Sequence, residues 1–350
     1  MRAAWAGALL GLCVVVATCA TSETAVGGPG GGGERFDLDR SLWRPGTVAE
    51  WGLGRSILVA SGLRDLHELA EYEKKLDRTI MRILDAARAD PSGLPLYLRI
   101  HHAMHTQALK KGYQLRASSM TRVLDEGAFN CLSGTGLYVL TAQRAGLVVS
   151  AYGMRGHILA LVFDADGAHH VETTFKEQSD PAVRQMVGLE ESSLIPEELK
   201  NTTFDVSPEE LVAMFYWNRA ADAAERHDFW DNQVSMLSYV SLGPTRPAGR
   251  HVVEKRDFFR AALQNQCDRD GCRRCVDLMD NWLRPERLGA SAQKPVVRDL
   301  RAECFERWYM TAPSTARCDV IYRAVRTDAQ HPRLAPWAES RELQECNWKR

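Results

Sequence analysis

One stretch of sequence, from 130 to 173, constrains the fold of this 350-residue chain more than any other. A helix is predicted to begin at Cys131, because Asn130 is a favourable N-cap and apolar residues recur at helical spacing up to a stop at Gly146. Three apolar stretches rich in β-forming residues follow, at 147–154, 157–163 and 168–173. The Asp-Ala-Asp-Gly segment at 164–167 is a strong hairpin signal between the last two. We therefore expect one helix followed by three antiparallel strands.

Outside this stretch the chain is predicted to be mostly helical. Apolar residues at helical spacing predict helices over 63–89 and 96–111, the second ending at Gly112. Ser207, followed by Pro208 and two glutamates, is typical of a helix start, and the chain from there to its end looks helical. The predicted fold class is α+β, with the helix at Cys131 packed on the antiparallel sheet and a mostly helical domain after it.

Gly134 and Gly136 lie inside the helix predicted to begin at Cys131. Glycine destabilises a helix interior, so we expect a sheet to pack very close to the helix at this point.

Three residues in this stretch could carry chemistry together. A thiolate at Cys131 would be stabilised by the free N–H groups and the positive end of the helix dipole at the helix start. His157 opens the second strand and can serve as its base, and a histidine that must keep one tautomer needs an acceptor on its other nitrogen. Glu172 is placed by the hairpin beside His157 and can be that acceptor.

These residues stand in motifs that resemble a known family. The motifs are Phe129-Asn130-Cys131-Leu132-Ser133, then Gly156-His157, then Val171-Glu172-Thr173-Thr174. In order and spacing, over about residues 101–175, they resemble the bacterial transglutaminase-like proteins of the papain-like superfamily. The resemblance implies a papain/transglutaminase-like core, expected over 46–190, with Cys131 as nucleophile, His157 as general base and acid, and Glu172 as the orienting carboxylate. Many relatives have the shorter Asp at the third position.

The implied activity is hydrolysis of an amide bond or acyl transfer through a thioester on Cys131. The backbone N–H of Cys131 would be one oxyanion donor, and the sequence does not identify the second. Each residue also has a plainer interpretation: Cys131 as a buried structural thiol, His157 as a partly buried histidine, Glu172 as a solvated carboxylate. The alternative function is accordingly a non-catalytic binding or scaffold module with a vestigial triad.

The N-terminus predicts export. Residues 1–25 have one arginine, an apolar segment and a small-residue exit, as in a secretory signal peptide; an uncleaved anchor is the alternative. Val16-Ala17-Thr18-Cys19 resembles a bacterial lipobox, although Thr18 is larger than the usual Gly or Ala, so lipidation of Cys19 stays open. A glycine-rich tether is expected over 26–45. The predicted location is the periplasm or, as a lipoprotein, the outer membrane.

Cysteine distribution agrees with export. Two cysteines, Cys13 and Cys19, lie in the predicted signal, and Cys131 stands alone in the middle of the chain. Six more crowd the last 84 residues: Cys267, Cys272, Cys275, Cys304, Cys318 and Cys346. In an exported protein they predict up to three disulfides stapling a helical domain at 205–350, with the pairing open. The C-x₄-C-x₂-C spacing also matches iron–sulfur ligands, but the arginines around it favour disulfides over a cluster or zinc. Residues 218–229 resemble one degenerate tetratricopeptide unit.

Charge and histidine content narrow the partners. A net charge of -1 lends no support to nucleic-acid binding, and the membrane is expected to be contacted only through a lipid on Cys19. His101 and His105 share a predicted helix face with His102 beside them, but the pattern lacks a zinc-protease glutamate and a third ligand, so no metal and no cofactor are expected. The expected partners are a peptide or protein substrate in the cell envelope and a protein bound by the helical domain.

Overall fold

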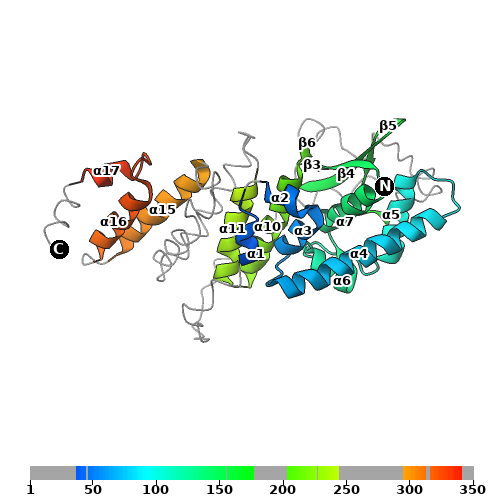
Figure 1. The fold of residues 1–350 in the computed structure, drawn as a ribbon, viewed down its shortest axis with the longest axis horizontal. Coiled ribbons are helices and arrows are strands. Elements are labelled where there is room, and N and C mark those ends of the chain that lie inside the picture. Colours follow the sequence, from blue (N-terminus) through cyan, green and yellow to red (C-terminus); the bar gives the residue numbers. More distant parts are fainter. Residues whose placement is uncertain are drawn as a thin grey trace, which may run out of the picture.

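The fold is of the α+β class, as predicted. The structure is a computed structural model that describes residues 37–44, 46–154, 156–176, 203–226, 228–243, 295–312 and 316–340. One small antiparallel sheet lies against several helices, and helix is the main secondary structure of the described residues (Figure 1). The predicted signal at 1–25, with Cys19, lies outside the described residues.

The sheet has four strands in the order β5-β4-β3-β6. Its strands are β3 (Val148–Met154), β4 (His157–Asp164), β5 (Gly167–Val171) and β6 (Phe204–Val206). The first three confirm the predicted strands, and the hairpin turns where predicted, with Asp164 paired to Gly167. The fourth strand, β6, was not predicted, since three residues are too few to carry a period. It pairs with the outer edge of β3.

Helix α7 (Cys131–Arg144) confirms the helix predicted before the sheet, and it packs on β3 and β4 (Figure 1). A Cβ atom built on Gly134 would stand 3.0 Å from the Phe129 ring and 3.2 Å from the hydroxyl of Thr173, just past β5. A Cβ on Gly136 would stand 3.0 Å from the ring of Phe215 in a later helix. Other residues therefore approach the helix closely at both glycines, as expected. Only at Gly134 do they lie on the sheet side of the helix; at Gly136 the neighbour is a later helix.

Helices and one short pair of strands make up the rest of the regular secondary structure in the described chain. The helices before α7 are α1 (Asp37–Ser41), α2 (Thr47–Trp51), α3 (Leu53–Ala60), α4 (Leu66–Ala89), α5 (Leu96–Gln107) and α6 (Met120–Glu126). Those after the sheet are α10 (Pro208–Glu225), α11 (Phe229–Leu242), α15 (Pro295–Thr311), α16 (Arg317–Asp328) and α17 (Ala335–Ala338). The strands β1 (Gly112–Tyr113) and β2 (Ala128–Phe129) pair in parallel.

Helix α5 ends earlier than predicted. It stops at Gln107 and not near 111, because the following residues turn towards β2: Lys111 N–H donates to the carbonyl of Gly127 at 3.0 Å. Gly112, predicted as the helix stop, has φ +83 and instead begins β1.

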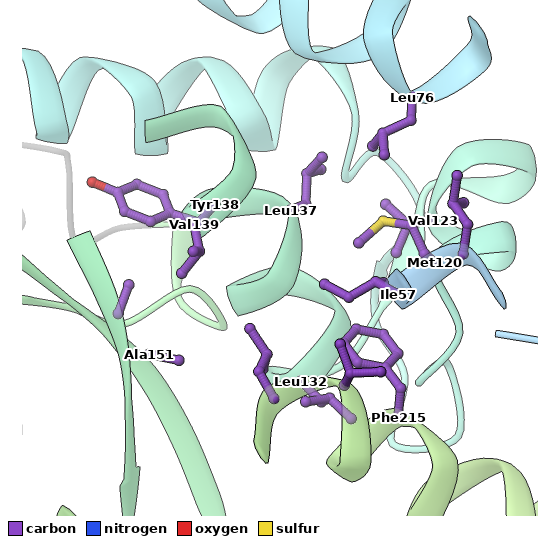
Figure 2. Close-up of a cluster of buried hydrophobic side chains, with 14 of the residues drawn as sticks. Ile57, Leu76, Met120, Val123, Leu132, Leu137, Tyr138, Val139, Ala151 and Phe215 are labelled. Atoms are coloured by element: carbon purple, nitrogen blue, oxygen red, sulfur yellow. The ribbon is translucent and has the colours of Figure 1, made fainter. Parts of the chain in front are cut away.

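The hydrophobic core joins elements from both sides of the predicted domain boundary at 205. Figure 2 shows Ile57 of α3 and Phe215 of α10 packed around Leu132 and Leu137 of α7. Val206 of β6 belongs to the same buried cluster. The first elements of the predicted helical domain thus share a core with the sheet and α7.

A buried ion cluster ties α1 to α10 and α11. Arg219 of α10 bonds Asp39 of α1 at 2.7 Å and Asp231 of α11 at 2.7 Å. Asp39 also accepts a hydrogen bond from the Tyr216 hydroxyl at 2.7 Å. A buried carboxylate is stable only with such partners, so these bonds hold Asp39 and its helix in the fold. The prediction of a tether over 26–45 is therefore wrong for residues 37–44.

Candidate functional site

The first residue of α7 is Cys131, a free thiol that is partly exposed. Asn130 caps the helix: its side-chain oxygen accepts from the backbone N–H groups of Leu132 and Ser133 at 3.0 and 3.1 Å, and the Ser133 hydroxyl accepts from the Asn130 N–H at 3.0 Å. The N–H of Cys131 itself has no acceptor in the described part of the chain. The sulfur therefore lies at a helix N-terminus where one N–H donor is available.

His157 lies between Cys131 and Glu172. Its Nε2 bonds Oε2 of Glu172, and its ring lies close enough to the thiol of Cys131 for the two groups to interact. Because Nε2 is engaged by the carboxylate, Nδ1 is the ring nitrogen that remains for the sulfur. The three predicted residues are thus brought together in the order thiol, imidazole, carboxylate.

The charge state of His157 follows from these two contacts. Burial alone would lower the pKa of the imidazole, but the hydrogen bonds and negative charges of Cys131 and Glu172 outweigh it and raise the pKa from 6.5 to about 10. At neutral pH the ring is therefore an imidazolium.

Glu172 is held at three points. Its Oε1 accepts from the N–H and the hydroxyl of Thr174 at 2.9 and 2.6 Å, and Oε2 reaches His157. Its backbone carbonyl accepts from Nε2 of His101 at 3.1 Å. Only 5% of its side chain is exposed, so the carboxylate is fixed by partners and not by solvent.

Two threonines, Thr135 and Thr173, connect the elements that carry the site. No sequence pattern pointed to them. The Thr135 hydroxyl, one turn into α7, bonds the hydroxyl of Thr173 at 3.0 Å and lies 3.3 Å from the carbonyl of Ile158. It therefore connects the helix that carries Cys131 with the residues next to His157 and Glu172. Only a sequence signal for which side chains meet across the helix–sheet interface could have found it.

One of the three histidines of α5, His101, contacts the same site. His101 is fully buried, and desolvation, with the nearby His105, lowers its pKa to about 3, so the ring stays neutral and donates through Nε2 to Glu172. His105 is buried beside it, at 4.7 Å between ring centroids, whereas His102 is exposed. Among the described residues, no group of three potential metal ligands forms.

A separate cleft of about 460 Å³ lies between α10, the turn at 61–64 and the segment 116–122. None of the three site residues lines it. Many of its charges are paired with each other: Arg116 bonds Glu225 at 2.8 Å, and Arg219 bonds Asp231 at 2.7 Å. We interpret this cleft as a polar seam between helices.

The C-terminal cysteines are described only in part. Cys304 is buried in α15, and Cys318 in α16 is disulfide-bonded. The pairing of the six stays a prediction, because Cys267, Cys272, Cys275 and Cys346 lie outside the described residues. The same holds for the iron–sulfur alternative.

In comparisons with known proteins, no family model, no curated protein and no solved structure matches the chain. Within the described ranges, no helix combines the length and apolarity needed to cross a bilayer. Fold and geometry together define an α+β protein with a clustered cysteine, histidine and glutamate.

Proposed function

We propose that this protein is a thiol-dependent amide hydrolase or acyl transferase with a papain/transglutaminase-like core. The observation that carries the proposal is the position of His157, which interacts with a free thiol and is bonded to an anchored carboxylate. A neutral buried thiol would not need this partner. An imidazolium beside Cys131 and a capped helix N-terminus both favour the thiolate, which is the attacking form.

The proposed reaction has two steps. The thiolate attacks an amide carbonyl, the C–S bond forms, the C–N bond breaks, and His157 gives its Nδ1 proton to the leaving amine. Neutral His157 then takes a proton from water, or from an acceptor amine, which attacks the thioester; the C–S bond breaks and the thiolate returns. Glu172 keeps the ring in the tautomer with the proton on Nε2 during the neutral phase.

The proposed setting is the cell envelope, where the substrate would be a peptide or protein. The predicted signal at residues 1–25 supports this location. The helical region after 205 is the proposed binding site for a protein partner. Fractionation of the expressing cell tests this part. Recovery of the unprocessed chain in the cytoplasm would overturn it.

Alkylation of Cys131 tests the proposed chemistry. The purified protein is treated with iodoacetamide near pH 7, and labelling at Cys131 and at the buried Cys304 is followed by peptide mass. We expect Cys131 to react much faster than a free cysteine, and the His157→Ala variant to lose most of that excess. Alkylation of Cys131 no faster than free cysteine would overturn the proposal and leave a binding module. Substrate profiling beside a Cys131→Ala control then identifies the acyl donor.

A further inference from the structure

Tyr113 lies beside the nucleophile although it is 18 positions earlier in the chain. In the parallel pairing of β1 with β2, Tyr113 is the partner of Phe129, two residues before Cys131. The next N–H, of Gln114, donates to the carbonyl of Phe129 at 2.7 Å, which fixes this register. The backbone of Tyr113 therefore runs directly alongside the approach to the first turn of α7.

The side chain of Tyr113 is directed to the same place. Its ring packs edge-on against Phe129, with centroids 6.1 Å apart, and it is 48% exposed. Its hydroxyl lies close enough to both Cys131 and Glu172 for their charges to act on it. Among the described residues, the hydroxyl makes no hydrogen bond.

The hydroxyl also keeps its proton. Burial of the ring, with the negative charges at Cys131 and Glu172, raises the pKa of Tyr113 above its usual value of 10. A neutral phenol that faces solvent beside a reactive sulfur is a hydrogen-bond donor that awaits an acceptor.

We infer that the Tyr113 hydroxyl is the second oxyanion donor, acting with the backbone N–H of Cys131. This inference rests on the proposed function, in which attack of the Cys131 sulfur turns a carbonyl oxygen into an oxyanion. In this inference the new charge lies between the two donors, and both donors keep their protons throughout. The hydrogen bonds from the Tyr113 O–H and the Cys131 N–H to the oxygen shorten as the charge forms and lengthen again when the C–N bond breaks.

Two reactions of the Cys131 sulfur distinguish an oxyanion donor at Tyr113 from a residue that only contacts the thiolate or supports the fold. Acylation by p-nitrophenyl acetate passes through an oxyanion, whereas alkylation by iodoacetamide displaces iodide from a CH₂ group and forms none. We expect Tyr113→Phe to slow acylation about 10- to 100-fold, below the larger losses known for enclosed oxyanion holes because this side chain is half-exposed. Its alkylation rate should stay within about twofold of wild type, which also reports an intact site.

Tyr72→Phe is the matched control. Tyr72 lies on α4 and donates its hydroxyl to Asp125 at 2.7 Å, so the variant loses a phenol without touching the site. Both its rates should equal those of wild type.

The outcomes are distinct. Equal acylation by Tyr113→Phe and wild type would overturn the inference alone, and an equal loss of acylation and alkylation would overturn it in favour of a contact with the thiolate. A wild-type protein that is alkylated but never acylated would overturn the proposed function, and the inference with it.

Discussion

Replacing Glu172 by Gln is the sharpest test of the triad, because it removes one charge and nearly keeps the side-chain shape. In the wild type, Oε2 bonds His157 while Oε1 accepts from the N–H and hydroxyl of Thr174. A glutamine whose oxygen keeps the bonds to Thr174 must turn its NH₂ group towards His157. Two donors would then face each other, so the neutral ring must move its proton from Nε2 to Nδ1, the nitrogen that serves the sulfur.

The size of the effect follows from the bond that is lost. A hydrogen bond to a charged group is worth about 1.5–3 kcal/mol, and about 1.4 kcal/mol corresponds to a factor of ten. We therefore expect Glu172→Gln to slow acylation of Cys131 by p-nitrophenyl acetate about 10- to 100-fold at pH 7. The variant should still fold, because the bonds with Thr174 can be kept, and circular dichroism checks this.

The same hairpin offers the control. At its other end Asp164 bonds His169 at 2.9 Å, a second carboxylate–imidazole pair that has no part in the site. Asp164→Asn should therefore acylate at the wild-type rate. Full activity in Glu172→Gln, or an equal loss in both variants, would refute the assignment of Glu172.

Three further outcomes can be measured by urea denaturation. Asn130→Ala removes the side-chain cap of two backbone N–H groups at 3.0 and 3.1 Å, and should lower the free energy of unfolding by about 1–2 kcal/mol; an unchanged value would mean that the cap is dispensable. Gly134→Ala gains about 1 kcal/mol of helix propensity. It also places a methyl 3.0 Å from the Phe129 ring and 3.2 Å from the Thr173 hydroxyl, and overpacking of this kind costs about 1–3 kcal/mol. We expect net destabilisation, and a stabilised variant would contradict the close packing. For His157, whose pKa is raised from 6.5 to about 10, the stabilising effect of the proton is complete below pH 6.5 and is lost as the pH rises to about 10. The loss of unfolding free energy in His157→Asn should therefore be larger at pH 6 than at pH 10, and the opposite trend would contradict a charged ring.

Local signals in the sequence were enough to predict part of the site. The helix cap at Asn130 and the hairpin turn at 164–167 each depend on about four consecutive residues, and both form as predicted. These two features place Cys131 at a helix start and bring β4, which begins at His157, and β5, which ends one residue before Glu172, into one hairpin.

The contacts that hold the site could not be predicted, because they join distant segments. His101 lies 71 residues from Glu172, and Thr135 lies 38 from Thr173. Each of these residues, viewed alone, suits an ordinary helix. The pairing of β1 with β2, which brings Tyr113 to the site, involves two residues on each strand and so leaves no period in the sequence.

The length of Glu172 is explained by where β5 ends. Pairing with β4 stops at Val171, opposite Ala160, so Glu172 and His157 are not cross-strand partners, and the side chain must reach past the end of the ladder. Its backbone cannot easily move closer, since its carbonyl is held by His101 at 3.1 Å. An aspartate, one methylene shorter, would have to release either His157 or Thr174. We therefore expect Glu172→Asp to acylate about as slowly as Glu172→Gln even though it keeps the charge. Wild-type speed in the aspartate variant would mean that the backbone at 172 is free to shift, and that His101 does not hold it.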